Sequence, residues 1–430
     1  MLSSMLTDWF PHAGARLLNL VGYWLVGNPL LINLNRKATI RKLRPIRNPK
    51  RILVVADLNI GDAVNLQSSF TALRDFFPYA RLDYAVANCA KGIIMGNPEI
   101  TRVYPVFTGR PLPNAKDCEE LRRITAETKY DFIINFCAFF DEKKDFDRSS
   151  IVISHVGLAR TIMHDEWRHT GTNHVVFQAY RFIHDLLDAT FVPVSKKPFT
   201  GVRVTIPDSG VAKARKFLFN LESSQSDSPL IYFNPDASSI FTQVPLASQA
   251  DILESLLCKL DCRILLGRGY TFPNCETDLV KALPDGLRNR IAVVPALMDL
   301  EGVAALIDFC DAYVGGDSGP LHIAASKKCS SSGNFHFRNQ TAVFSIFGAT
   351  PARIYGYDSK QRGFLPSNQH ASSRVYTAAI PCRNMSCINK RAKTCREVRC
   401  FDSLNTNEII GDIASNLRRN RITFVSTAVA

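Results

Sequence analysis

Short apolar runs alternate with segments of helical periodicity through the first half of this 430-residue chain. The runs that predict buried strands are 52–56, 82–87, 102–106 and 131–136. Between them, residues 66–77 carry apolar side chains at three- and four-residue steps, which predicts a helix with one apolar face. Strands that alternate with helices in this way are typical of a parallel sheet covered by helices. We therefore predict an α/β domain at residues 51–195.

A second alternation follows residues 196–210, which the prolines mark as a linker. Its predicted strands are 230–233, 263–266, 291–294, 312–314 and 342–347, and its predicted helices are 246–260, 276–283, 300–309 and 407–417. The polar stretch 327–340 predicts a loop. We expect a second doubly wound domain at 211–420, with ligands bound in a crevice at the carboxyl ends of the strands.

One motif joins a predicted strand to a predicted helix in the second domain. Residues 311–326, DAYVGGDSGPLHIAAS, run from an apolar segment through two glycines into apolar positions at helical spacing. Asp317 and Ser318 can cap that helix, and its first N–H groups attract anions such as phosphate. The alternative is an ordinary strand-to-helix turn.

The net charge of +13 comes from two segments. Residues 1–51 and 382–400 carry +8 and +5, so the rest of the chain is balanced, and a general nucleic-acid-binding surface is excluded. In the first segment, the uncharged stretch 17–35 is a poor membrane-spanning helix because of Asn19, Asn28, Pro29 and Asn33. This segment, treated as a unit at 1–50, can lie on an anionic membrane surface or form a helical hairpin with a solvated charged face.

The twelve cysteines show no disulfide framework. No secretion signal with a cleavage site is seen, so we expect a reducing, cytoplasmic setting. Four cysteines lie in the basic loop 382–400: Cys382, Cys387, Cys395 and Cys400. Their spacing is looser than that of the usual zinc pairs, so they are either structural ligands of zinc or iron, or free thiols or adventitious disulfides. The basic residues among them suit an anionic acceptor or a membrane surface, or else form a solvated loop.

Asp62 is the candidate catalytic base. It follows Gly61 in the loop after the first strand, where a carboxylate can accept a proton from an attacking hydroxyl. A helix N-cap is the alternative role.

Two groups of motifs resemble one known family. The segments NIGDAV, ALRDFFP, ARLDYAVA and GNPEITRVYPV are similar to the amino-terminal domain of the lipopolysaccharide heptosyltransferases, glycosyltransferase family 9. LMDLEGVAALIDFCDAYVGGDSGPLHIAAS and AVFSIFGATPARIYG resemble the donor-binding half of these enzymes, in matching order. The resemblance covers roughly residues 51–412, and the pair DSGPLH and FGATPAR carries most of its specificity.

This resemblance implies a GT-B fold, in which two Rossmann-like domains face a central cleft. It implies inverting, metal-independent transfer of a heptose or related sugar from a nucleotide-diphosphate donor, typically ADP-heptose, to the lipopolysaccharide core or another glycan. No cofactor is required for catalysis. We expect a cytoplasmic enzyme, peripheral at the inner face of the membrane, with an anionic glycan or lipid acceptor.

The resemblance also implies residue roles. Asp62 is the general base, while Ser318 and Gly319 hold the diphosphate through backbone N–H groups. Asp317 and His322 bind on the sugar side. The other expected donor contacts are Glu276 for the ribose, Ser238, and Thr350 for the nucleotide, although a glutamate at Glu276 is also ordinary in an exposed first helical turn.

One position departs from the family pattern. The family usually carries Lys-x-Trp-Pro after the first strand of the second domain, and its lysine contacts the donor phosphate. Here Thr242 and Val244 stand at those places, in NPDASSIFTQVP. Ser238, Ser239 and Thr242 can donate hydrogen bonds and Arg268 can supply charge, but a neutral donor is weaker than a charged one. The alternatives are therefore another nucleotide sugar, a protein acceptor, or a GT-B binding module that has lost catalysis.

Overall fold

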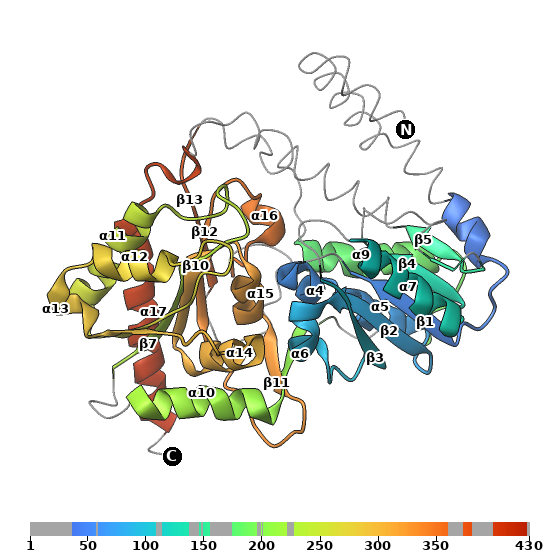
Figure 1. Ribbon diagram of the computed structural model, residues 1–430, viewed down its shortest axis with the longest axis horizontal. Helices are drawn as coiled ribbons and strands as arrows, with labels where there is room; N and C mark the ends of the chain where they lie inside the picture. The colour runs from blue at the N-terminus through green and yellow to red at the C-terminus, as the bar shows by residue number, and fades with distance from the viewer. Residues whose placement is uncertain are drawn as a thin grey trace, which may run out of the picture.

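Two parallel sheets, each covered by helices, make up the computed structural model (Figure 1). The structure describes residues 37–56, 59–108, 114–136, 146–147, 149–154, 174–195, 199, 201–221, 228–359, 373–380 and 399–427, with side chains up to residue 417. The sheets and their covering helices are mixed α/β in the order that the apolar runs predict.

The first sheet has the strand order β3-β2-β1-β4-β5, and all its neighbouring strands are parallel. Its strands are β1 (Arg51–Val55), β2 (Arg81–Ala87), β3 (Arg102–Phe107), β4 (Phe132–Asn135) and β5 (Val152–Ser154). Its helices are α4 (Ile60–Asn65), α5 (Ser68–Phe76), the 3₁₀ turn η1 (Asn88–Ala90), α6 (Lys91–Ile94), α7 (Ala115–Glu127) and α9 (Val175–Leu187). Residues 52–55 of β1 are fully buried, because helices cover both faces of the central strand.

The second sheet has the order β13-β12-β10-β7-β8-β9 and is also parallel. Its strands are β7 (Leu230–Asn234), β8 (Arg263–Leu266), β9 (Ile291–Val293), β10 (Ala312–Gly316), β12 (Ala342–Phe347) and β13 (Ser373–Thr377). Its helices are α10 (Asp208–Leu221), α11 (Leu246–Lys259), α12 (Cys275–Ala282), α13 (Asp285–Arg288), α14 (Leu300–Phe309), α15 (Gly319–Ala325), α16 (Ala352–Tyr355), the turn η4 (Arg399–Phe401) and α17 (Thr406–Thr427).

The two loops of interest follow the inner strands of the two sheets. β1 lies between β2 and β4, and β10 lies between β7 and β12. The loops that follow β1 and β10 therefore leave each sheet at a point where strand order reverses, which is where open α/β sheets bind ligands. Helices α4 and α15, which begin directly after these loops, pack against each other where the two halves meet (Figure 1).

A small third sheet corrects one expectation. Strand β6 (Arg203–Ile206) lies within the predicted linker 196–210, and β11 (Lys327–Ser330) lies within the stretch 327–340 that we expected to be a loop. The two strands pair in parallel. The loop prediction was wrong for residues 327–330 because a four-residue strand has too short an apolar pattern to be recognised without its distant partner.

The amino-terminal region carries charge at the surface. Residues 37–43 are helical, and Leu43 is buried while Lys37, Arg41 and Arg44 are exposed. The predicted membrane-surface stretch 17–35 lies outside the described residues. Among the helices that the structure describes, none is long and apolar enough to cross a membrane.

Candidate functional site

Asp62 lies on a short helix that leaves the first sheet at its carboxyl edge. Helix α4 has Asn59 as its N-cap, and Asp62 is the third residue of the helix. The alternative in which Asp62 itself caps the helix is therefore wrong. Its side chain is partly exposed, in contrast to the neighbouring Gly61 and Ala63, which are buried.

Two glycines bring α4 and α15 into close contact. A Cβ added to Gly61 would lie 2.5 Å from Cδ2 and 3.0 Å from Nε2 of the His322 ring. In the same way, a Cβ on Gly319 would lie 3.0 Å from Cβ of Ile60. The absence of side chains at these positions lets the backbones approach. The structure thus brings Asp62 of the first half next to the DSGPLH segment of the second.

The turn between β10 and α15 does not cap helix α15 in the way that we predicted. Ser318 is the N-cap by position, with φ −158° and ψ 167°, but its side chain does not cap the helix. Its Oγ instead accepts a hydrogen bond from Asn234 Nδ2 at 3.1 Å and lies 3.3 Å from both Tyr313 Oη and the carbonyl of Gly316. The prediction that Asp317 or Ser318 caps through its side chain was wrong, because a tighter set of partners lies beneath the turn.

Four buried polar side chains from both halves meet behind this turn. His322 Nδ1 lies 3.3 Å from Asn65 Nδ2 and 3.0 Å from Tyr357 Oη, and that hydroxyl donates to Asn65 Oδ1 at 3.1 Å. The ring of His174 stacks obliquely on Tyr357 with centroids 4.5 Å apart. Burial, aided by nearby His322, lowers the pKa of His174 to about 3, so this imidazole stays neutral. Burial raises the pKa of Tyr357, which keeps its hydroxyl protonated.

Asp317 faces this cluster from the open side. Its Oδ1 lies 3.7 Å from His322 Nε2, and its carboxyl side chain is 15% exposed against 6% for the imidazole. The sequence prediction grouped Asp317 and His322, and the structure brings them together. Asn65 and Tyr357 were missed, because neither position stands out in the sequence.

A loop after β7 supports the same edge of the second sheet. The carboxylate of Asp236 accepts backbone N–H groups of residues 270, 271 and 272 at 2.8–3.1 Å. Thr242 is buried, and its Oγ1 lies 3.2 Å from the N–H of Ser239, to whose carbonyl it donates at 3.1 Å. At the position where the resemblance led us to look for a phosphate-binding lysine, this chain therefore has a hydroxyl that closes its own turn. An Asn-Pro-Asp sequence after a strand was the available signal for Asp236.

Glu276 is buried, which corrects the alternative of an exposed glutamate in a first helical turn. Its Oε2 accepts the backbone N–H of Gly269 at 3.0 Å, and its Oε1 lies 3.4 Å from Nη2 of Arg268. The carboxylate can be buried because these donors compensate for its lost hydration. Arg268, which we considered as a source of positive charge, is thus held by Glu276.

The two remaining donor-side candidates differ in environment. Thr350 follows β12 and is 4% exposed, and its Oγ1 finds no hydrogen-bond partner among the described residues. A buried hydroxyl without a partner is costly, so it is a ready contact for a ligand. Ser238 is exposed in the loop after β7.

The predicted metal site cannot be located. Cys382, Cys387 and Cys395 lie outside the described residues, and Cys400 is buried in η4. Within the described part of the chain, no group of three or more potential ligands is suited to a metal ion.

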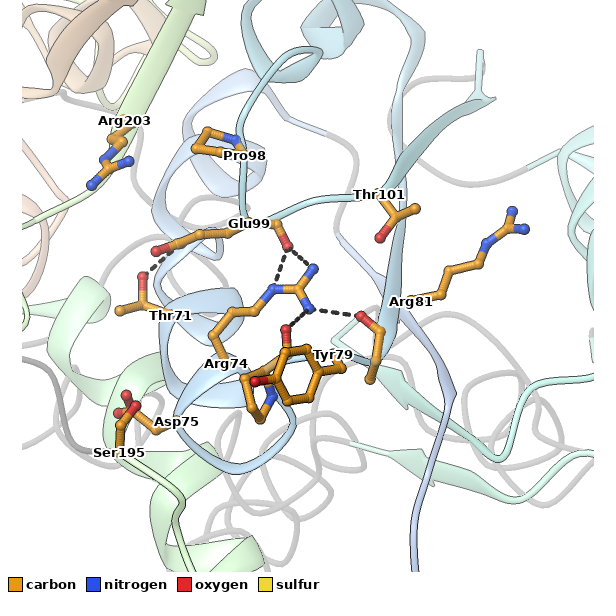
Figure 2. A pocket seen from close by; sticks show the side chains of 12 residues that line it. Thr71, Arg74, Asp75, Tyr79, Arg81, Pro98, Glu99, Thr101, Ser195 and Arg203 are labelled. Atoms are coloured by element: carbon orange, nitrogen blue, oxygen red, sulfur yellow. Dashed lines mark hydrogen bonds between the residues drawn. The ribbon is translucent and has the colours of Figure 1, made fainter.

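A cavity of about 700 Å³ lies elsewhere, near the amino ends of β2 and β3. Arg74 is one of its lining residues, and its guanidinium donates to the carbonyls of Glu99, Pro78 and Ala80 (Figure 2). This cation is already satisfied by main-chain oxygens, and the cavity opens at the strand ends opposite to those near Asp62. It is therefore separate from the candidate site.

Comparison with known proteins agrees with this architecture. Residues 206–382 match the family described as Glycosyltransferase family 9 (heptosyltransferase). No curated protein matches the chain. The fold is shared with a family 9 glycosyltransferase from Veillonella parvula, which has a TM-score of 0.62 at 17% identity over 86% of this chain and 98% of that one.

Two Escherichia coli structures share the fold as well. ADP-heptose lps heptosyltransferase II has a TM-score of 0.54 at 16% identity, covering 86% of this chain and 99% of its own. Heptosyltransferase WaaC, solved with ADP, has a TM-score of 0.52 at 18% identity, covering 85% and 99%. The prediction of a GT-B fold with two Rossmann-like halves is confirmed, and the resemblance to the family is confirmed for residues 206–382.

Proposed function

We propose, from the match of residues 206–382 to glycosyltransferase family 9, that this chain transfers a heptose or related sugar with inversion from a nucleotide-diphosphate donor. The observation that carries the proposal is the contact of α4 with α15, where Gly61 abuts the ring of His322. That contact sets a carboxylate from one half beside a polar turn from the other. A base and a donor site on separate domains are what a transfer between two bound substrates requires.

In this proposal Asp62 is the general base. It removes the proton of the acceptor hydroxyl while the oxygen attacks the anomeric carbon from the face opposite the diphosphate. The bond from the anomeric carbon to the phosphate oxygen breaks, and the nucleoside diphosphate leaves with the electron pair. The proton stays on Asp62 until water takes it.

The donor is assigned to the turn between β10 and α15 and to the loops beside it. Backbone N–H groups at Ser318 and Gly319 would face the diphosphate, and Asp317 and His322 the sugar. The remaining donor contacts are Glu276, Ser238 and Thr350. The hydroxyl of Thr350, which has no hydrogen-bond partner among the described residues, supports this assignment because a nucleotide would supply one.

ADP-heptose is the proposed donor, and the lipopolysaccharide core or another anionic glycan is the proposed acceptor. The names of the Escherichia coli proteins that share the fold support both, as ADP-heptose and lipopolysaccharide appear in one and ADP in the other. A different nucleotide sugar is the second candidate. It is favoured by the structure of the Thr242 turn, which offers no cation to the phosphate.

A panel of nucleotide sugars tests the donor. Thermal unfolding is measured with ADP-heptose, other ADP-sugars, UDP-sugars and the free diphosphates, because a ligand that binds only the folded state raises the midpoint. We expect the largest shift with ADP-heptose, followed by a product of the corresponding mass with a suitable acceptor. Larger shifts with UDP-sugars would refute the heptose assignment, and no shift with any member would favour a binding module.

Substitution of Asp62 tests the catalytic step. Asp62→Asn preserves side-chain size but cannot accept the proton, so we expect unchanged donor-induced stabilisation and loss of transfer. Transfer at the wild-type rate in this variant would remove Asp62 from the base role.

Contact with an anionic surface is also proposed, because residues 37–51 expose basic side chains and contain no carboxylate. Such a surface suits phosphate groups of a lipid or of a glycan acceptor. It would place the enzyme at the cytoplasmic face of the membrane, where a lipid-linked acceptor is accessible.

A further inference from the structure

The buried cluster behind the site surrounds the ring of His322 with hydrogen-bonding groups. A neutral imidazole carries its proton on either Nδ1 or Nε2, and the partners of the ring decide which. Nδ1 of His322 faces two groups that carry hydrogens, the amide of Asn65 and the hydroxyl of Tyr357. Nε2 faces the carboxylate Oδ1 of Asp317 at 3.7 Å.

One neutral arrangement places a donor opposite each acceptor, with the single hydroxyl hydrogen of Tyr357 shared between Asn65 Oδ1 and His322 Nδ1. Tyr357 Oη donates to Asn65 Oδ1, which turns the amide nitrogen of Asn65 toward His322 Nδ1. Nδ1 then accepts, and the ring proton lies on Nε2. If Asn65 were turned over, its oxygen would require a proton on Nδ1, and the lone pair of Nε2 would face the carboxylate of Asp317, which is electrostatically unfavourable.

We propose that Asn65 and Tyr357 are positioning residues that hold His322 as the Nε2–H tautomer, so that this histidine presents a hydrogen-bond donor toward Asp317 and the bound substrate. The two residues come from different halves of the molecule: Asn65 ends α4, three residues after Asp62, whereas Tyr357 follows α16. The donor at Nε2 is therefore set correctly only when α4 lies against α15. Contact between the two halves therefore both places Asp62 at the site and orients the imidazole of His322.

The surroundings of the cluster favour the Nε2–H tautomer of His322. Asn65, His322 and Tyr357 are 2%, 5% and 4% exposed, so water does not compete for their hydrogen bonds. Gly61 provides the space that the ring occupies, since a Cβ there would overlap Cδ2. His174, whose neutral ring stacks on Tyr357, adds no charge to the cluster.

The test is the ¹⁵N NMR spectrum of His322, recorded on the full chain with labelled histidine and assigned by its loss in His322→Gln. We expect a pyrrole-like Nε2 and a pyridine-like Nδ1 at neutral pH. Asn65→Asp replaces the amide N–H with an oxygen and so removes the donor to Nδ1. In this variant we expect a proton on Nδ1, either as the other tautomer or as the imidazolium, which is also favoured by Asp317 and the nearby Asp62.

A second variant and a control keep the test decisive. Tyr357→Phe frees the amide of Asn65 to rotate, so we expect a mixture of both tautomers. Tyr130→Phe is the matched control, because it also removes a buried hydroxyl, one that donates to Asp83 at 2.8 Å and has no contact with His322. We expect its His322 signals to match the wild type. A wild-type Nδ1–H tautomer, or unchanged signals in both Asn65→Asp and Tyr357→Phe, would overturn the proposal.

The kinetic consequence rests on the proposed function, whereas the tautomer does not. If His322 donates to the donor substrate and Asn65→Asp converts it to the Nδ1–H tautomer, kcat should fall by on the order of 10²-fold, as expected when a hydrogen-bond donor to the reacting groups is lost. The imidazolium keeps its Nε2–H and should not show this loss. KM for the acceptor should change little. A changed spectrum with no transfer activity in any protein, wild type included, would refute the proposed function and leave the tautomer assignment intact.

Discussion

The contact at Gly61 predicts how sensitive the site is to the spacing of α4 and α15. In Gly61→Ala the new Cβ would lie 2.5 Å from His322 Cδ2. Carbon atoms in contact are separated by about 3.5 Å, so the ring or the helix must move by about 1 Å. Overpacking of this kind costs about 1–3 kcal/mol, and replacing glycine in a helix returns about 0.5–1 kcal/mol. We expect a net loss of stability of about 0–2.5 kcal/mol.

The effect on catalysis should be larger than the effect on stability. A displacement of 1 Å at reacting groups costs roughly 10²-fold in rate. We therefore expect kcat of Gly61→Ala to fall by about 10²-fold. The affinity for the donor should change less than kcat, because His322 is the one proposed donor contact that the new methyl group is known to displace, and the others belong to loops of the second half. The measurements are transfer kinetics, thermal unfolding and donor-induced stabilisation.

A matched variant separates the local clash from the general effect of replacing a helical glycine. Gly411 lies in α17, and nothing lies within 4 Å of a Cβ added there. Gly411→Ala should keep wild-type kinetics and gain about 0.5–1 kcal/mol of stability. Wild-type transfer by Gly61→Ala would refute the reasoning, since it would mean that the spacing of α4 and α15 does not control the reaction.

Three further predictions concern other parts of the structure. Burial lowers the pKa of Lys328 to about 8 from its ordinary 10.5, so the unfolded chain binds more protons than the folded chain between these pH values. The free energy of unfolding should therefore rise from pH 8 to 10.5 by at most about 1.4 kcal/mol per pH unit. Lys328→Met should remove this slope when unfolding is measured in urea. Asp236→Ala should lower the free energy of unfolding by about 2–4 kcal/mol and weaken donor binding, because three backbone N–H groups of residues 270–272 lose a charged acceptor. Unchanged donor affinity would show that this loop is not part of the site. Replacing both Arg41 and Arg44 with Glu should weaken binding to phosphatidylglycerol vesicles at least 10-fold, at about 1 kcal/mol for each positive charge removed. Equal binding of the wild type and this double variant would exclude this face as a lipid contact.

The strands and helices of the two main sheets could be predicted because their patterns are local. Strand β12 and helix α14 have the bounds that the apolar residues predict. Strand β12 is buried at every position, as a strand covered on both faces must be, and so it appears as a continuous apolar run. Helix α14 begins after Asp299, whose side chain accepts from the N–H of Gly302. Signals of this kind lie within ten residues of each other.

The features that were missed depend on partners far away in the chain. Strand β6 pairs with β11 about 120 residues later, and neither segment has a pattern of its own. The burial of Glu276 depends on the loop at Gly269 and on Arg268, which fold back toward it. Asn65 and Tyr357 are 292 positions apart, and their roles follow only from the shape of the interface between the two halves. Sequence patterns gave the candidate groups at the site but not the residues that orient them.

The missing lysine at position 242 is best understood from the loop around it. The hydroxyl of Thr242 closes a turn with Ser239, and its backbone carbonyl lies 2.9 Å from the place that a Cβ on Gly316 would occupy. The side chain is therefore directed into its own loop while the backbone packs against the end of β10.

A long cation at position 242 would have to leave the turn or bury its charge, and burying an unpaired ammonium is unfavourable. The loop thus shapes the carboxyl edge of the second sheet. Under the proposed function, backbone N–H groups and hydroxyls would meet the negative charge of the diphosphate. Such a site depends more strongly on exact geometry than one with a mobile lysine, because neutral donors act only at hydrogen-bond distance, whereas a charge acts over several ångströms.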